Sequence, residues 1–137
     1  MTFPKIKDDA DMGRTILAVD DDPMYIDLVA DVAASQQYEV ISAPNGATAL
    51  NLLMKHHVDL IVSDVDMPVM DGLAFHTTLR RDERFSAIPF VFLTGTTNPK
   101  ALDYITDHAE ARHIPKGNLV TELTALLEQF QNSREPS

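Results

Sequence analysis

Five short apolar runs, separated by stretches with helical spacing of their apolar residues, constrain the fold of this chain more than any other feature. The run at residues 60–62 is too short for a helix, is rich in β-branched residues and is typical of a strand buried on both faces. Strands that alternate with helices predict a parallel sheet covered by helices on both faces. We therefore expect an α/β fold, a flavodoxin-like doubly wound (βα)5 sheet with strand order 2-1-3-4-5. The expected strands are residues 15–19, 38–42, 60–62, 88–93 and 111–114.

Helix starts are indicated by residues that cap the first turn. Asp22 before Pro23 is expected to be an N-cap followed by proline at the first helical position, so its role is structural. The other expected starts are Asn45-Gly46, about residue 73 for a helix that ends near residue 81, and Asn98-Pro99. The last helix has the clearest apolar stripe, which consists of Leu119, Leu123, Leu126, Leu127 and Phe130.

Length and composition predict one domain and exclude several kinds of site. We expect a flexible arm at residues 1–13, a single domain at residues 14–131 and a disordered tail at residues 132–137. The net charge of -10 argues against direct nucleic-acid binding, and the absence of cysteine excludes disulfides and thiolate chemistry. No apolar run approaches the roughly 20 residues that span a bilayer, and the polar N-terminus is unlike a signal peptide. We expect a cytoplasmic protein that does not contact membranes.

Charged and polar side chains follow four of the predicted strands. Asp20 and Asp21 follow the first strand, Asp64 follows the third, Thr94 ends the fourth and Lys116 follows the fifth. A parallel sheet gathers these ends on one edge, and the predicted strand order places the first and third strands side by side. Three carboxylates would repel one another there, and Lys116 offsets only one charge. A divalent cation held by oxygen ligands, Mg²⁺ or Mn²⁺, would neutralise the remainder.

The full set of motifs comprises, in order, Asp20-Asp21, Asp64-Val-Asp66-Met-Pro68, Asp71-Gly72, Thr94-Gly95 and Pro115-Lys116. In residue types, order and spacing, this set resembles the receiver domain of two-component response regulators over roughly residues 14–131. The resemblance implies that Asp64 accepts a phosphoryl group from the phosphohistidine of a sensor histidine kinase or phosphotransfer protein. It further implies that the chain is a phosphoacceptor that assists its own phosphorylation and dephosphorylation, and not an enzyme with a separate substrate.

The resemblance also implies a role for each residue of the site. Asp21 and Asp64 would bind Mg²⁺ directly together with the backbone carbonyl of Asp66, while Asp20 would act through water. Lys116 would pair with the phosphoryl oxygens. Thr94 would turn inward to hydrogen-bond them and draw its loop along. A downstream effector would then read the surface of the fourth helix, fifth strand and last helix.

Two residues depart from the family pattern. Gly117 stands where proline usually follows the lysine, which loosens that loop. His113 replaces the aromatic residue that usually tracks the switch threonine. Because an imidazole can ionise, we expect His113 to be a switch residue whose protonation favours the outward, inactive arrangement.

Two alternatives to a phosphorylated receiver remain open from the sequence. A phosphatase of the haloacid dehalogenase type also has Asp-x-Asp after an apolar strand, which Asp64 and Asp66 match. That family, however, expects Thr or Val at the position of Pro68 and an acidic pair downstream of the lysine, where Glu122 and Glu128 lie on a helix. The other alternative is a receiver-like interaction module that has lost phosphorylation, against which the retained charged groups argue.

Overall fold

The computed structural model describes residues 14–134, with side chains through residue 131. The expected flexible arm at residues 1–13 lies outside the described residues, as do residues 135–137. Helix α5 (Leu119–Arg134) continues past residue 131, so part of the stretch expected to be a disordered tail is helical.

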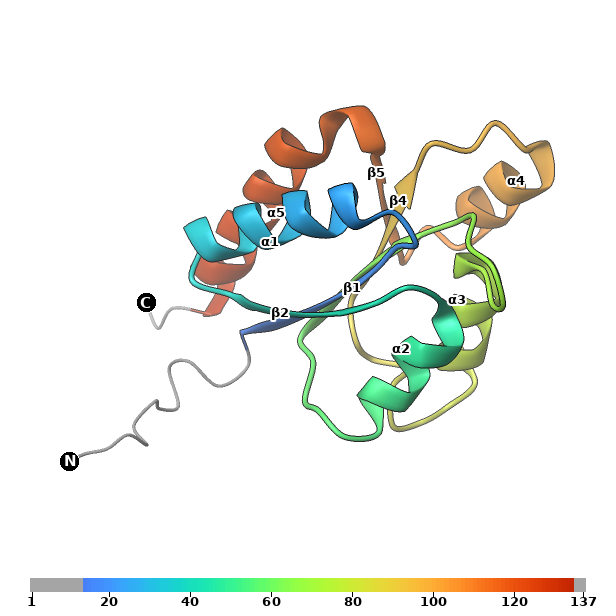
Figure 1. Cartoon of the computed structure of the whole chain (residues 1–137), viewed down its shortest axis with the longest axis horizontal. Helices are drawn as coiled ribbons and strands as arrows, with labels where there is room; N and C mark the ends of the chain where they lie inside the picture. The colour runs from blue at the N-terminus through green and yellow to red at the C-terminus, as the bar shows by residue number, and fades with distance from the viewer. Residues whose placement is uncertain (1–13, 135–137) are drawn as a thin grey trace.

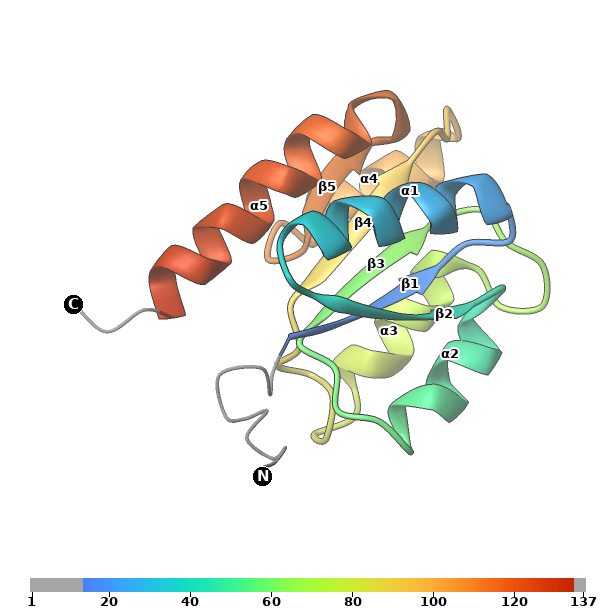
Figure 2. The same ribbon diagram turned by 60° about the vertical axis from the view of Figure 1, so that its left-hand side comes forward.

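The strands form one parallel sheet in the order β2-β1-β3-β4-β5, which confirms the predicted α/β fold class and strand order (Figure 2). Every residue of β3 and β4 is buried, as expected for central strands of a sheet covered on both faces. The strand bounds are β1 Thr15–Val19, β2 Glu39–Ala43, β3 Leu60–Asp64, β4 Phe90–Thr94 and β5 Arg112–Pro115.

The helices form two layers, one on each face of the sheet. Helices α1 and α5 cover one face, and α2, α3 and α4 cover the other (Figure 1). Because successive strand residues point to opposite faces, Ile16 packs in the core beneath α1 and α5, whereas Leu17 packs in the core beneath the other three helices. The remaining helix bounds are α1 Pro23–Ser35, α2 Gly46–Leu53, α3 Gly72–Arg80 and α4 Pro99–Asp107. Within residues 14–134, no helix combines the length and apolar character needed to cross a bilayer.

Capping side chains fix the helix starts at the carboxyl edge of the sheet. The carboxylate of Asp22 accepts a hydrogen bond from the Met24 amide at 2.9 Å, which confirms the predicted N-cap of α1. Asn45 and Asn98 cap α2 and α4 in the same way, as predicted. Helix α3 begins at Gly72, one position before the expected start, because Asp71 caps it through the Ala74 amide.

The C-terminus of α1 explains why β2 begins later than residue 38, the predicted start. The amide of Tyr38 donates to the Ala33 carbonyl at 2.8 Å, and the amide of Gln37 donates to Ala34 at 3.1 Å. This pair of bonds is a Schellman motif, which requires a left-handed residue at Gln37, where φ is 66°. Tyr38 therefore closes the helix, and its buried ring belongs to the core beneath α1.

Gln37→Gly is expected to stabilise the protein by about 1 kcal/mol, because glycine adopts a positive φ without the steric penalty of a Cβ. Urea denaturation of the two proteins measures this gain. Gln36→Gly is the matched control, since Gln36 has a φ of -112° and glycine there only adds freedom to the unfolded chain. A loss of stability in both variants would contradict the assignment of Gln37 as the strained residue.

Candidate phosphoacceptor and metal site

The carboxyl ends of the strands bring the predicted site residues to one edge of the sheet. Asp20 directly follows β1, Asp64 is the last residue of β3, and Lys116 directly follows β5. Thr94 ends β4, one position past Leu93, the register partner of Asp64. Asp66 lies in the loop that leaves β3, with its side chain exposed.

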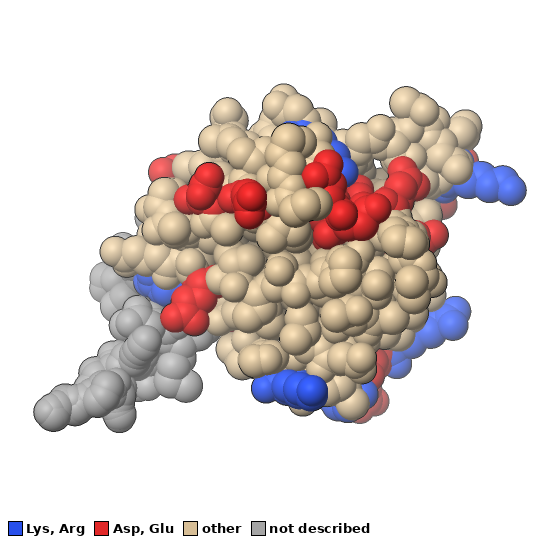
Figure 3. Space-filling model, viewed as in Figure 1, with Lys and Arg blue, Asp and Glu red and all other residues tan. Residues whose placement is uncertain are grey.

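Three carboxylates converge at the point where β1 and β3 end. One ligand oxygen from each of Asp20, Asp21 and Asp64 lies within 4.8 Å of the others. Figure 3 shows acidic side chains gathered near the start of α1, with a basic group beside them. Asp20 and Asp64 are each 4% exposed, whereas Asp21 is exposed. The site therefore has two buried carboxylates and one that faces solvent.

Backbone amides hold the two buried carboxylates in place. One oxygen of Asp20 accepts a hydrogen bond from the Asp22 amide at 2.9 Å, and Asp64 Oδ1 accepts one from the Val65 amide at 2.8 Å. Lys116 Nζ lies 3.3 Å from Asp64 Oδ1 and 3.4 Å from Asp20 Oδ2. One cation thus bridges the two buried carboxylates.

The charge of the site remains unbalanced despite this bridge. Burial, reinforced by the nearby charge of Asp20, raises the pKa of Asp64 from 3.8 to about 6. Burial also raises the pKa of Asp20. For Lys116, burial alone would lower the pKa, but the charges of Asp64 and Asp20 outweigh it and raise the pKa. Raised carboxyl pKa values in a cluster of this kind are typical of functional sites.

The donor set fits a divalent cation. Asp20 Oδ2 is buried and has no hydrogen-bond partner, apart from the ion pair with Lys116. Together with Asp21 and Asp64, it offers only carboxylate oxygens, the ligands that Mg²⁺ prefers. A bound ion would satisfy the orphaned oxygen through one of its waters and would relieve the repulsion among the three carboxylates. The geometry thus supports the predicted all-oxygen metal site.

The loop after β3 is held against the backbone of Asp64. A Cβ placed on Gly72 would lie 2.1 Å from the Asp64 carbonyl oxygen, so only glycine fits at the start of α3. The Gly72 amide donates to the Val65 carbonyl at 2.8 Å. Farther along the loop, Val69 has a φ of 71°, a strained value for a β-branched residue. The loop therefore follows a tightly constrained path beside the candidate phosphoacceptor.

Thr94 and His113 are directly connected. Thr94 Oγ1 and His113 Nε2 share a hydrogen bond of 2.7 Å between adjacent strands β4 and β5. Thr94 is buried and His113 is exposed, so the imidazole occupies an outward position. The predicted switch pair is thus in contact, although the switching itself stays a prediction.

One residue of the site, Tyr25, is not among the site residues predicted from the sequence. Its ring lies against Lys116, with Nζ 4.1 Å from the ring centroid. The available signal was an aromatic residue in the first turn of the helix that follows the acidic pair. Without the fold, this position could not be distinguished from an ordinary residue at the edge of α1.

Comparison with known proteins agrees with this geometry. Residues 16–128 match the response regulator receiver domain family, which shows that the chain belongs to that family of two-component signalling domains. The chain is also similar to the sensor histidine kinase RcsC of Escherichia coli, with 32% identity over 138 residues. That match covers 98% of this chain and 14% of RcsC, so the chain corresponds to a small part of that relative.

Solved structures show the same fold. The signal receiver domain of a signal transduction histidine kinase from Syntrophus aciditrophicus has a TM-score of 0.78 and 26% identity, and the match covers 90% of this chain and 93% of that one. The response regulator TrrA from Thermotoga maritima, solved in complex with Mg²⁺ and BeF, has a TM-score of 0.71 and 25% identity, and the match covers 85% of this chain and 97% of that one.

Family membership decides against the haloacid dehalogenase alternative. The acidic pair lies upstream of Asp64, at the end of β1.

Proposed function

We propose that Asp64 is the phosphoacceptor of this receiver and takes its phosphoryl group from a phosphohistidine. A carboxylate oxygen of Asp64 would attack phosphorus, the phosphorus–nitrogen bond would break, and the imidazole would leave with a proton from solvent. The observation that carries the proposal is the ion pair of Lys116 with Asp64 inside a cluster of three carboxylates. Phosphoryl transfer depends mainly on positioning and charge neutralisation, and this arrangement provides both.

We assign the metal ligands to Asp21, Asp64 and the backbone carbonyl of Asp66, with Asp20 acting through water. When bound, Mg²⁺ would neutralise charge on the phosphoryl oxygens. Lys116, whose ammonium lies 3.3 Å from Asp64 Oδ1, would contact a phosphoryl oxygen. Mn²⁺ is an alternative ion, because the oxygen donors suit either metal.

The proposal extends to partners and location. The donor would be a sensor histidine kinase or a phosphotransfer protein, and the reader would be a downstream effector, in the cytoplasm where such kinases present their phosphohistidine. The net charge of -10 favours protein partners over direct contact with nucleic acid. The chain would be modified stoichiometrically and would turn over no separate substrate.

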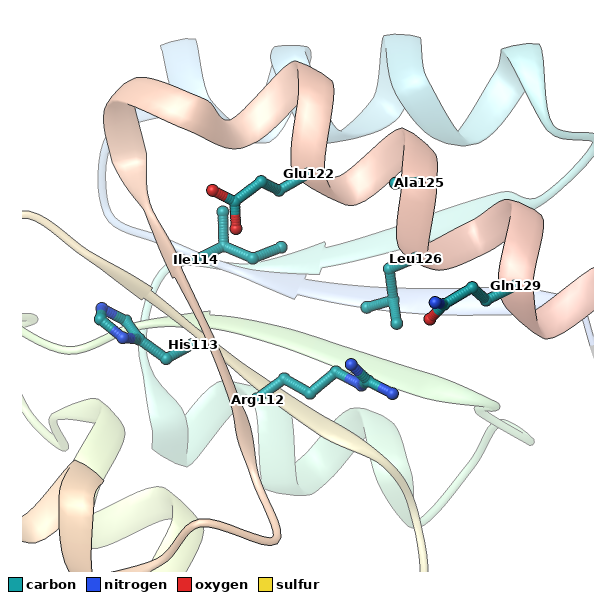
Figure 4. A pocket seen from close by; sticks show the side chains of 7 residues that line it. All are labelled: Arg112, His113, Ile114, Glu122, Ala125, Leu126 and Gln129. Atoms are coloured by element: carbon teal, nitrogen blue, oxygen red, sulfur yellow. The ribbon is translucent and has the colours of Figure 1, made fainter.

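A groove beside His113 supports a readout surface. It lies between β5 and α5, encloses about 420 Å³ and is lined by residues that include Arg112, His113, Glu122 and Gln129 (Figure 4). His113 links the groove to Thr94 through their shared hydrogen bond. The His113 imidazole lies on the opposite side of β5 from Glu122 and Gln129 (Figure 4), so a movement of Thr94 toward the phosphoryl group would reach the groove through β5.

Acetyl phosphate tests the proposed function without a kinase. Incubation with Mg²⁺ is expected to add one phosphate per native chain, as detected by the mass of the intact protein. Chelation of Mg²⁺ with EDTA should prevent labelling. Labelling that persists after chelation, or that never occurs, would contradict the proposal, and the second result would favour the interaction module that has lost phosphorylation.

His113→Phe is expected to tighten beryllofluoride binding about five-fold in the presence of Mg²⁺. The Thr94 hydroxyl must leave its hydrogen bond with His113 to reach a phosphoryl oxygen, and one such bond is worth about 1 kcal/mol. Titration followed by NMR measures the affinity, with His56→Phe as a control at an exposed histidine. Weaker binding by His113→Phe would show instead that the imidazole assists the active state. The same titration at two pH values tests the pH dependence expected for His113.

A further inference from the structure

Lys116 has an aromatic neighbour as well as its two carboxylate partners. Its ammonium lies 4.1 Å from the centroid of the Tyr25 ring, close enough for a cation–π interaction. The Lys116 side chain is 18% exposed, so the ammonium is largely removed from water. A desolvated ammonium with two carboxylates on one side and a ring face on another has little remaining freedom.

The start of α1 fixes the position of the ring. Tyr25 lies in the first turn of α1, directly after the acidic pair, and its amide donates to the Asp22 carbonyl at 3.1 Å. Asp22 caps the helix and Pro23 fixes its first turn. The same short segment therefore presents the carboxylates of the site and the aromatic face. Helices α1 and α5 lie on the same side of the sheet (Figure 2). The Tyr25 ring on α1 reaches Lys116 at the β5–α5 junction.

The backbone around Lys116 gives the lysine little other restraint. The next residue is Gly117, and a Cβ built there would meet no atom within 4 Å. A Cβ on Gly95 would reach Lys116 Cδ at 3.5 Å, so the stem of the lysine lies along open backbone. A lysine has a long flexible stem, and its head could turn to solvent if nothing covered it. Besides the carboxylates of Asp20 and Asp64, the Tyr25 ring is the group that the structure places against the ammonium.

We propose that Tyr25 is a positioning residue for phosphoryl transfer, which holds the Lys116 ammonium over Asp64 through the face of its ring. The inference rests on the proposed role of Lys116 as the group that contacts the phosphoryl oxygens. Tyr25 itself touches no reacting atom. Its contribution is to keep the ammonium poised, so that an incoming phosphoryl group meets it without prior rearrangement.

Two substitutions distinguish the effect of the aromatic ring of Tyr25 from the effects of its hydroxyl and its apolar bulk. Tyr25→Phe keeps the ring and removes the hydroxyl, whereas Tyr25→Leu keeps an apolar residue that suits a helix and removes the ring. With Mg²⁺ present, Tyr25→Leu should weaken beryllofluoride binding and slow phosphorylation by acetyl phosphate about ten-fold. For Tyr25→Phe, beryllofluoride affinity and the rate of phosphorylation should both stay within about two-fold of the native values. Mg²⁺ affinity without beryllofluoride should be preserved in both, because the ring acts on the ammonium and is not a metal ligand.

A double-mutant cycle distinguishes positioning from a general structural effect. In a Lys116→Ala background, Tyr25→Leu should cause no further loss of beryllofluoride affinity, since the ammonium that the ring holds is gone. A comparable loss of beryllofluoride affinity in both backgrounds would overturn the inference. Equal losses of affinity for Tyr25→Phe and Tyr25→Leu would overturn it too, as would no loss in Tyr25→Leu. If the native protein with Mg²⁺ binds no beryllofluoride, the proposed function fails along with this inference. If the native protein and Tyr25→Leu bind it equally, only this inference fails.

Discussion

Gly72→Ala is expected to destabilise the protein by about 3 kcal/mol or more and to abolish labelling by acetyl phosphate. The added methyl carbon would lie 2.1 Å from the Asp64 carbonyl oxygen and 3.0 Å from both the Asp64 carbonyl carbon and Val65 Cα. All three atoms belong to the backbone, so no side chain can turn aside to relieve the clash. Either α3 must move away from β3 or the end of β3 must shift, and the second movement displaces the candidate phosphoacceptor.

Gly117→Ala is the matched control for this substitution. It adds the same methyl group next to the same site, but at a position with no atom within 4 Å. Its stability should be unchanged or slightly higher, because alanine reduces the freedom of the unfolded chain. Denaturation in urea compares the three proteins. Equal midpoints for Gly72→Ala and Gly117→Ala would contradict the close contact between α3 and Asp64.

Asp64→Asn is expected to stabilise the metal-free protein near neutral pH by about 2 kcal/mol, or roughly 6 °C in Tm. Burial and the charge of Asp20 raise the pKa of Asp64 from 3.8 to about 6. The folded state therefore holds the proton more tightly than the unfolded state does. The resulting contribution to the stability of the native protein is complete below about pH 4. It is lost as the pH rises through about 6, where the buried carboxylate must ionise. Asparagine keeps the shape of the side chain and never ionises, while Lys116 retains its ion pair with Asp20.

Thermal unfolding across the range from about pH 4 to 8 measures this difference. The difference in Tm between Asp64→Asn and the native protein should widen as the pH rises. Saturating Mg²⁺ should close this difference by stabilising the native protein. Asp27→Asn, at an exposed aspartate on α1, controls for the change in net charge. A gap that narrows with rising pH would show that ionised Asp64 stabilises the fold.

The sequence was sufficient to predict a parallel sheet with the site at its carboxyl edge, and the flavodoxin-like arrangement supplied the strand order. Apolar runs end in Asp20, Asp64 and Thr94, and a parallel sheet leaves only one edge where these ends can meet. The boundaries of β2 were less accurate, because the run at residues 38–42 contains Tyr38, whose burial serves the end of α1 and not the strand. Hydrophobicity alone does not distinguish these two uses of an apolar residue.

Contacts between side chains on different elements could not be predicted. His76 is fully buried and shares a 2.7 Å hydrogen bond with the Tyr104 hydroxyl, a contact that no sequence motif indicates. That contact joins α3 to α4 and depends on how the two helices pack. The ring of Tyr25 over Lys116 likewise depends on the placement of α1 beside the β5–α5 junction. The alternation of strands and helices follows from periodicity, whereas such pairs follow from the geometry of packing.

The identity of the phosphorylated residue is the most direct test of the central claim. Borohydride reduces an acyl phosphate at an aspartate to homoserine, which marks the modified position permanently. The protein labelled with acetyl phosphate and Mg²⁺ should, after reduction and peptide mapping by mass spectrometry, contain homoserine at position 64 in place of Asp64. Asp64→Asn treated in the same way should contain none. Homoserine at Asp20 or Asp21 in the native protein, or equal labelling of Asp64→Asn, would contradict the assignment.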